Sequence, residues 1–149
     1  MVTIRSAEGS DADGLRVLLD QLGYPATRER VVANLKCACD RGDVLVAIEG
    51  DELLGFASYQ FVYFFEDGAP RCRLTAIAVR DTARMMGVGR RLLREVERLA
   101  HDAGCTAVEA SSSRRPERGA AHRFYPALGF VDAHREGVFF TKNLRVDSP

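Results

Sequence analysis

The sequence predicts an α/β fold in which a central mixed β-sheet of about seven strands is flanked by about four helices. Short apolar runs rich in β-branched residues, typical of strands, are separated by stretches in which apolar residues recur at helical spacing. These elements follow the order β-α-α-β-β-β-α-β-α-β-β, which does not alternate strictly and therefore favours a mixed sheet over a doubly wound parallel one. A chain of 149 residues has the length of one domain, so we expect a single domain over residues 1–149.

The first part of the chain predicts a strand followed by two helices. Val2–Arg5 has the composition of a short strand, and residues 10–13 (SDAD) resemble a capping box at the start of a helix. Residues 23–25 (GYP) end that helix. Thr27 is a suitable N-cap for the second helix, which ends before residues 41–43 (RGD).

A β-hairpin is expected next. The strand-like runs Val44–Ile48 and Leu53–Phe65 are joined by the turn-forming residues 49–52 (EGDE). The last part of the second run, Phe61–Phe65, is more apolar than a solvated strand end. Two interpretations of it stay open: core packing with a dimer contact, or one wall of an acceptor site with Tyr24 and Pro25 opposite.

The second half begins with Leu74–Val79, an apolar run that predicts a buried strand. From Val88 to Ala103 apolar residues recur at helical spacing and charged residues fill most of the other face, which predicts a core-facing amphipathic helix. The remaining predicted elements are a strand at Ala107–Ser111, a helix at Pro116–Leu128, and strands near Phe130 and at Val138–Thr141.

Between the buried strand and the amphipathic helix lies the motif Arg84-x-x-Gly87-x-Gly89. Glycines in the first turn of a helix let backbone N–H groups approach an anion closely, and the helix dipole favours negative charge there. The pattern thus predicts a pyrophosphate cradle, although taken alone it also fits a helix-entry turn that needs glycine for packing. ATP and NAD motifs fit poorly, because no Gly-Lys-Ser/Thr follows and position 92 is Leu instead of a third glycine.

This motif resembles the acetyl-CoA-binding motif of the GNAT family of N-acetyltransferases, Gln/Arg-x-x-Gly-x-Gly/Ala. A second block, residues 121–130 (AHRFYPALGF), resembles the later signature of that family, a Tyr-bearing helix followed by Leu-Gly-Phe. The two blocks occur in the expected order at roughly the expected spacing, and the likeness covers nearly the whole chain, including a QLGYP segment at residues 21–25.

The resemblance implies a GNAT-like fold in which the motif strand and the next strand splay apart and the pantetheine arm bonds to the backbone near Ile77 and Val79. It implies an N-acetyltransferase that moves the acetyl group of acetyl-CoA directly to a primary amine in a ternary complex, without metal. The acceptor, a small molecule or a peptide, enters from the opposite side. The cofactor-binding residues implied are Ile77, Ala78, Val79, Arg84, Met85, Met86, Gly87, Val88, Gly89 and Arg90.

For catalysis, the resemblance assigns Tyr125 as the acid that protonates the leaving thiolate; the alternative is an aromatic residue that only packs its helix. Glu109 is the candidate base if its strand is oriented favourably. Glu66 and Asp67 are alternatives that act through water. His122 is a further candidate because an unperturbed imidazole changes charge near neutrality, and the alternative for it is a surface or capping role.

Several positions differ from the family pattern. A Glu is frequent where Thr75 stands, which leaves the general base unassigned, and a glycine is frequent where Met85 stands. We therefore expect Met85 to adopt a conformation open to non-glycine residues. Pro126 is expected to kink or end its helix near Tyr125. These differences keep a second interpretation open, a catalytically weak CoA-binding or protein-interaction module of the same fold. Transfer of a longer acyl group is a third.

The basic residues of the second half have two interpretations as well. Arg114, Arg115, Arg118 and Arg123 either reach the phosphates of CoA or solvate their helix.

Composition narrows the choice of partners. The chain carries 21 basic and 21 acidic residues, which argues against nucleic acid or an anionic membrane as an obligatory partner. Its four cysteines form no C-x-x-C pair, so we expect free thiols, no metal site and a cytoplasmic location. No apolar run approaches the ~18 residues of a membrane span. A homodimer is the expectation at the level of the family.

Overall fold

The computed structural model describes residues 1–38, 42–111, 119–131 and 140–144. The chain divides into two compact units, Met1–Ser111 and Ser112–Pro149. The first unit holds a five-stranded sheet and three α-helices, and the helix described in the second unit is α4 (Gly119–Ala127).

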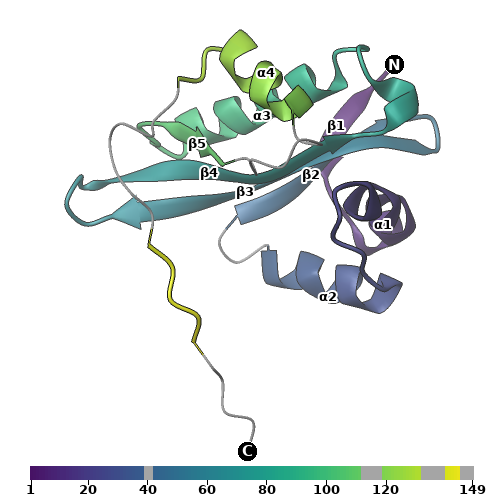
Figure 1. The fold of residues 1–149 in the computed structure, drawn as a ribbon, viewed down its shortest axis with the longest axis horizontal. Helices are drawn as coiled ribbons and strands as arrows, with labels where there is room; N and C mark the ends of the chain where they lie inside the picture. Colours follow the sequence, from purple (N-terminus) through teal and green to yellow (C-terminus); the bar gives the residue numbers. More distant parts are fainter. Residues whose placement is uncertain (39–41, 112–118, 132–139, 145–149) are drawn as a thin grey trace, which may run out of the picture. The chain divides into compact units, whose positions relative to one another are not determined.

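The sheet is mixed, as the sequence predicts. Its strands are β1 (Thr3–Ser6), β2 (Gly42–Glu49), β3 (Glu52–Phe64), β4 (Ala69–Val79) and β5 (Val108–Ala110). They lie side by side in chain order, the first four antiparallel to their neighbours and β5 parallel to β4 (Figure 1). Of the two further strands expected, Phe130, Phe140 and Thr141 are not in strands, and Val138 and Phe139 lie outside the described residues.

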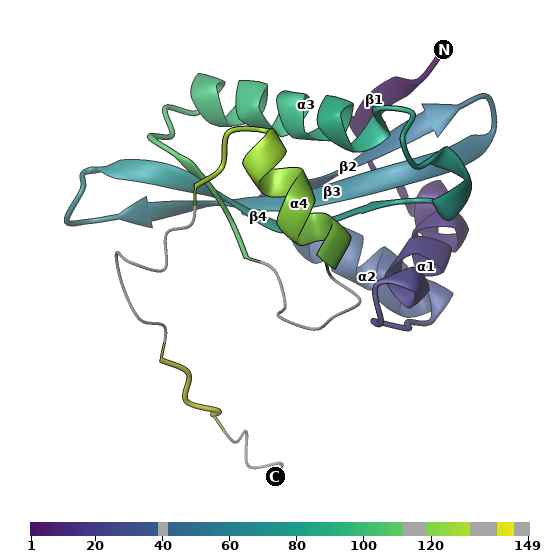
Figure 2. The same cartoon turned by 45° about the horizontal axis from the view of Figure 1, so that its top comes forward.

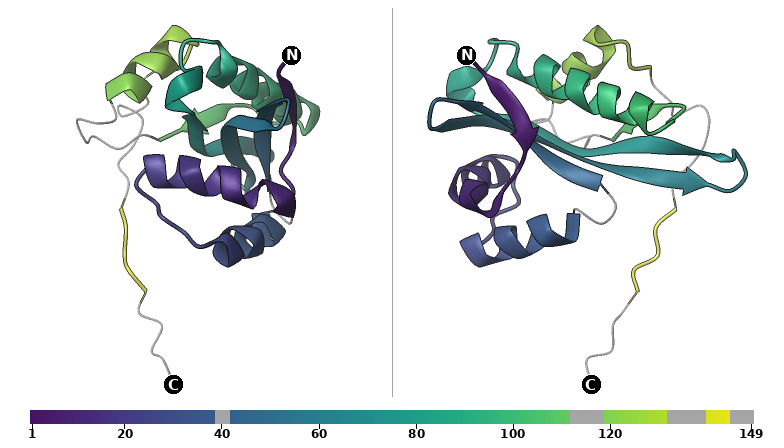
Figure 3. Two further views of the ribbon diagram at one scale, coloured as in Figure 1. Left: turned by 90° about the vertical axis from the view of Figure 1, so that its right-hand side faces the viewer. Right: turned by 180° about the vertical axis from the view of Figure 1, so that it is seen from behind.

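Helices cover both faces of the sheet in the first unit. α1 (Ala12–Gln21) and α2 (Arg28–Ala38) lie on one face, and α3 (Val88–Asp102) lies on the other (Figure 3). The core under α1 and α2 joins Leu15, Leu18 and Val31 to strand residues that include Phe56 and Ala78. Each large apolar side chain buried in this way contributes about 1.5–3 kcal/mol.

α3 packs closely on the sheet because β3 carries a glycine beneath it. The residues buried on α3 are Val88, Leu92, Leu93, Val96 and Ala100. A Cβ atom at Gly55 would come within 2.8 Å of the Ala78 carbonyl oxygen and 3.2 Å of the Val88 Cγ1 atom. Gly55 therefore sets the height at which the first turn of α3 sits above β3 and β4.

The start of α1 differs from the sequence prediction. The capping box is formed by Glu8 and Asp11 around a 3₁₀ turn (Gly9–Asp11), and not by residues 10–13. The carboxylate of Asp11 accepts from the Glu8 amide at 2.7 Å and from both terminal nitrogens of Arg5 at 2.7 and 2.9 Å. The prediction was wrong because Arg5, on β1, holds Asp11 in place, and this tertiary partner has no signature in the local pattern.

A β-bulge interrupts the pairing of β3 with β4. Tyr59 lies opposite Leu74 and Ser58 lies opposite Ala76, so Thr75 is an extra residue on β4. Beyond it, the β3–β4 hairpin runs on past the end of β2, which pairs with β3 only as far as Gln60 (Figure 2). Bulges bend a strand and change the direction of its edge.

Within the described part of the chain, no helix is long and apolar enough to cross a membrane. Three cysteines described by the structure, Cys37, Cys72 and Cys105, are free thiols as expected, and Cys39 lies outside the described residues.

Candidate active site

β4 has one open edge. β5 pairs with β4 only at Cys72, Arg73 and Leu74, although β4 continues to Val79. In the ranges that the structure describes, no strand pairs with this side of β4 after Leu74. The strands thus part at the bulge, as the resemblance implies, and Thr75–Val79 presents a free edge.

The backbone groups on this edge follow from the pairing on the other side. The amide of Arg80 donates to the Leu54 carbonyl on β3 at 2.7 Å. Because N–H and C=O groups alternate in direction along a strand, the polar groups of Val79 and Ile77 point away from β3, toward the open edge. An extended ligand with amide groups can pair there as an added strand does.

A side chain from α1 already reaches this edge. Gln21, the last residue of α1, donates its side-chain amide to the Val79 carbonyl at 3.0 Å. The bond joins residues 58 positions apart and holds the end of α1 beside the open edge. No local pattern in the sequence indicates this contact of Gln21.

The motif loop follows directly after β4. Gly87 is the N-cap of α3 with φ 76°, in the left-handed region, and no side chain caps this helix. The first amide bonded within the helix is that of Arg91, which donates to the Gly87 carbonyl at 3.1 Å. The amides of Val88, Gly89 and Arg90 therefore lack helical partners and point out of the helix start, where they can bind an anion.

Exposed arginines surround this helix start. Arg84 pairs with Asp81 at 2.8 Å, and both side chains are exposed. Arg90 is exposed and makes no ion pair with any described residue. Arg91 bonds instead to the Val2 carbonyl at 2.7 Å. The guanidinium groups of Arg84 and Arg90 remain accessible to a phosphate.

The backbone conformation of Met85 differs from the one expected from the sequence. Its φ is 65°, and it is the non-glycine residue of the described chain with a positive φ. Its side chain is fully exposed, and that of Met86 is 58% exposed. A left-handed conformation costs a non-glycine residue about 1–2 kcal/mol. Met85 therefore takes the conformation that a glycine would favour, and the loop carries the strain.

Glu109 lies on β5 next to the fork and is held by two arginines. Its Oε1 atom accepts from Arg71 at 2.9 Å and its Oε2 atom from Arg73 at 3.3 Å. Arg71 also pairs with Asp67 and lies over the Phe64 ring, 4.7 Å from its centre. Both carboxylate oxygens of Glu109 are thus engaged in tying β5 to β4. Glu66, which with Asp67 is an alternative candidate for the general base, is exposed.

In the second unit, the Leu-Gly-Phe signature closes the helix that carries Tyr125. The Phe130 amide donates to the Tyr125 carbonyl at 3.1 Å and the Gly129 amide to the Pro126 carbonyl at 3.2 Å, while Gly129 has φ 89°. This is a Schellman motif, and the Tyr125 and Phe130 rings make its usual apolar contact, with centroids 5.4 Å apart. The motif fixes the orientation of the Tyr125 ring on α4.

The helix that carries Tyr125 ends slightly later than Pro126 predicts. α4 runs to Ala127, two residues past Tyr125, and Pro126 lies inside it. Arg123 is exposed. Arg114, Arg115 and Arg118 lie outside the described residues.

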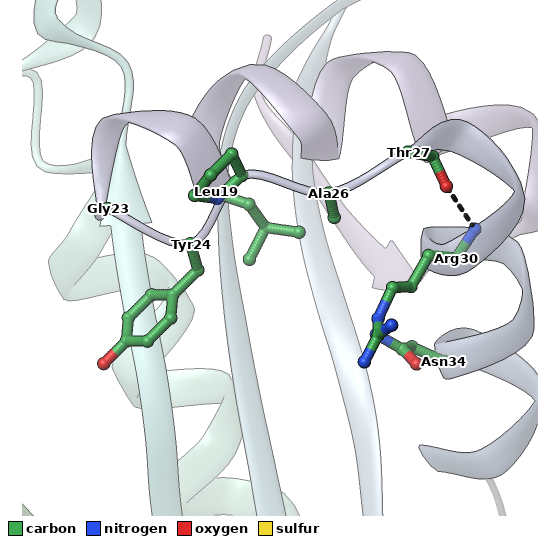
Figure 4. Close-up of a pocket in the computed structure, with 8 residues that line it drawn as sticks. Leu19, Gly23, Tyr24, Ala26, Thr27, Arg30 and Asn34 are labelled. Carbon is green, nitrogen blue, oxygen red and sulfur yellow. Dashed lines mark hydrogen bonds between the residues drawn. The ribbon is translucent and has the colours of Figure 1, made fainter.

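The loop between α1 and α2 forms an open hollow of about 540 Å³ (Figure 4). Tyr24 and Pro25, expected in an acceptor-site wall, line it together with Arg30 and Asn34. Thr27 caps α2 as predicted, accepting from the Arg30 amide at 3.2 Å. In the aromatic run, Tyr63 and Phe65 are 64% and 91% exposed.

Residues 15–130 match the family model described as the acetyltransferase (GNAT) family. The chain belongs to the GNAT family of acetyltransferases. Its mixed sheet with helices on both faces is thus that of a GNAT fold. No curated protein matches the chain.

Several solved structures are similar to this chain over almost their full lengths. A GNAT family acetyltransferase from Staphylococcus aureus is 26% identical, with a TM-score of 0.76 over 96% of this chain and 98% of that one. A transcriptional regulator from Bacillus halodurans is 25% identical, with a TM-score of 0.79 over 95% and 100%. The aminoglycoside N-acetyltransferase AAC(6')-Iy, solved with CoA, has a TM-score of 0.80 over 97% and 96%, at 24% identity.

Proposed function

We propose that this GNAT protein is an N-acetyltransferase that uses acetyl-CoA to acetylate a primary amine by direct attack in a ternary complex. The observation that carries the proposal is the continuity of two ligand-binding features, the open edge Thr75–Val79 and the uncapped start of α3 that follows it. The first suits the amides of a pantetheine arm and the second suits a pyrophosphate.

The proposed cofactor site contains the ten residues expected from the sequence. Ile77 and Val79 offer backbone groups at the open edge, while Ala78 is buried between them. Met85, Met86, Gly87, Val88 and Gly89 supply the loop and helix start, and Arg84 and Arg90 supply charge. CoA bound to AAC(6')-Iy supports the choice of this cofactor, as a property of a protein with the same fold.

The reaction requires little beyond positioning and proton transfer. A neutral amine first adds to the thioester carbonyl, forming the N–C bond, and collapse of the tetrahedral intermediate then breaks the C–S bond; one proton leaves the nitrogen and one is taken up by the thiolate. Amides at the open edge of β4 stabilise the oxyanion that forms between these steps. Tyr125, a phenol with a reference pKa of about 10, is our proposed donor to the thiolate.

Tyr125→Phe tests this role. Removing the hydroxyl while keeping the ring should lower the rate of acetyl transfer about tenfold or more and leave acetyl-CoA affinity unchanged. The rate is followed by release of free CoA thiol with a panel of primary amines. Thr3→Val, which removes an exposed hydroxyl from β1, is the control and should behave as wild type. An unchanged rate in Tyr125→Phe would remove this residue as the acid.

The ion pairs of Glu109 favour one rival function, a CoA-binding or protein-interaction module with little catalysis, because they occupy the candidate base. Glu109→Gln separates the roles. If Glu109 ties β5 to β4, the variant unfolds more easily and keeps the pH profile of kcat/KM. If Glu109 is the base, the acid limb of that profile disappears. A module without catalysis would bind acetyl-CoA but release no thiol with any amine.

We further propose a single domain over residues 1–149, since the family model spans the boundary at Ser111. A homodimer is proposed on the exposed Tyr63 and Phe65, which would be covered by a second copy. A cytoplasmic location remains a prediction from the sequence.

A further inference from the structure

Two hydroxyl groups meet where β4 parts from β5. Ser58 Oγ and Thr75 Oγ1 are 2.7 Å apart, and Thr75 is the extra residue of the bulge. Pairing with β5 ends at Leu74, one residue earlier. The hydroxyl pair therefore lies at the fork from which the open edge begins.

The pair faces the side of the sheet that carries α1 and α2. Phe56 belongs to the core cluster beneath those helices. Because side chains alternate along a strand, Ser58 lies on the same face two residues later, and the contact brings the Thr75 hydroxyl there too. Thr75 is exposed and Ser58 half-buried, so α1 and α2 do not cover them. α3 lies on the opposite face, so within the described part of the first unit this face remains open to an incoming molecule (Figure 3).

The pair also lies near the reacting end of the proposed cofactor. Phosphates bound at the start of α3 would direct an extended arm back along β4 toward the fork. From Val79 to Thr75 the strand spans about 13 Å at about 3.3 Å per residue. The thioester end of such an arm lies toward Thr75 and the pyrophosphate end toward Gly87.

The direction of the hydrogen bonds determines what the pair can bind. Thr75 Oγ1 donates its one proton to the Ser58 carbonyl at 3.1 Å. In the contact between the two hydroxyls, Ser58 must then be the donor. Ser58 Oγ has thereby used its proton and retains only lone pairs, so a further partner must be a hydrogen-bond donor.

We propose that the Ser58 hydroxyl, oriented by Thr75, binds the acceptor by accepting an N–H from its primary amine. This inference rests on the proposed acetyl transfer. A primary amine held by one N–H keeps its lone pair for the thioester carbonyl and its second N–H for release to water. Thr75 is the positioning residue, because its bond to the Ser58 carbonyl fixes which way the Ser58 proton points.

The test compares Ser58→Ala, Thr75→Val and Thr75→Ser in acetyl transfer to the amine that the wild type uses best in a panel of spermidine, kanamycin and lysine amide. Ser58→Ala should lower kcat/KM for the amine about tenfold, the effect of one hydrogen bond, with the Kd for acetyl-CoA unchanged. Thr75→Val should lower kcat/KM for the amine by a smaller factor, because the Ser58 hydroxyl remains but is free to rotate. Thr75→Ser should restore the wild-type value.

The matched control is Thr3→Val, which removes an exposed hydroxyl from β1. Thr3 pairs with Ile48, which pairs with Leu53, five residues along β3 from Ser58, so this variant should change nothing. A wild-type kcat/KM in Ser58→Ala would overturn the proposal, and so would an equal loss of acetyl-CoA affinity, which would show a structural role. If no amine is acetylated, the same amines are titrated calorimetrically into the CoA-saturated protein. Binding that Ser58→Ala weakens supports the acceptor site and refutes the proposed transfer; no binding, or binding that Ser58→Ala leaves unchanged, refutes the site.

Discussion

The chain segments at the starts of α1 and α3 differ: the first is closed by side chains, and the second is open to solvent. Each helix leaves amides without helical partners at its first turn. Before α1, Asp11 is 8% exposed and accepts from the Glu8 amide and from Arg5. At α3, Gly87 offers no side chain, and the loop before it is exposed and includes the left-handed Met85.

The difference shows that the start of α1 contributes to stability, whereas the start of α3 remains available to a ligand. A closed cap with a partly buried ion pair stabilises the fold but leaves nothing for an anion to bind. An uncapped start gives up that stabilisation, which is about 1 kcal/mol for an ordinary cap. α2 has an ordinary N-cap, in which the Thr27 side chain accepts a hydrogen bond from the Arg30 amide. Of α1, α2 and α3, α3 begins with neither a capping side chain nor a capping box in the turn before it, and we assign its open start to ligand binding.

The largest expected effect is on the open start. Gly87→Val places a β-branched side chain at φ 76° and in front of the amides, so the affinity for acetyl-CoA should fall about 100-fold or more. Calorimetry measures the affinity. Gly104→Val is the control, because Gly104 has φ 78° at the other end of α3 and imposes the same backbone strain far from the loop. Equal affinity losses in both variants would trace the effect to strain alone.

A change at the closed start of α1 should alter the free energy of unfolding. Asp11→Asn leaves Arg5 without its carboxylate and should lower the free energy of unfolding by about 2 kcal/mol, less than for a fully buried pair because water screens a partly exposed arginine. Chemical denaturation measures it, and acetyl-CoA affinity of the folded variant should not change. Glu95→Gln, which removes an exposed pair with Arg98, is the control and should have a smaller effect.

The contribution of the Arg5–Asp11 pair to stability should depend on pH. The Arg5 guanidinium lowers the pKa of Asp11 below its ordinary value of 3.8. A lowered folded-state pKa contributes stability above the unfolded pKa, and this contribution is lost as the pH falls through the folded value. The stabilities of wild type and Asp11→Asn should therefore begin to converge as the pH falls below about 4 and coincide only below the lowered folded-state pKa of Asp11. A constant difference down to pH 2 would contradict the assignment.

The smallest expected effect concerns Met85. Met85→Gly relieves the left-handed strain but adds freedom to the unfolded chain, so the net gain in unfolding free energy should be about 0.5 kcal/mol. Thermal denaturation compares it with Met86→Gly, whose φ is negative and which should be destabilised by about as much. Stabilisation of both variants, or of neither, would show that Met85 carries no strain.

The sequence predicted the features that local patterns encode. Periodicity gave the hairpin, the amphipathic α3 and the mixed sheet, and the glycine motif gave the uncapped helix start. The missed features depend on residues far apart in the chain. Arg5 moved the capping box to Glu8, and the Gln21 contact with Val79 joins α1 to β4. A clue to the bulge existed in Thr75, a polar residue within an apolar strand, but only the register shows that it is the extra residue.

The most direct test of the central claim is a calorimetric titration of the protein with acetyl-CoA, with ATP and NAD as controls. The open edge of β4 and the uncapped start of α3 together predict saturable binding of acetyl-CoA at one site per chain, lost in Gly87→Val and kept in Gly104→Val. Absence of binding, or an equal response to ATP, would contradict the account and reduce residues 84–89 to a helix-entry turn.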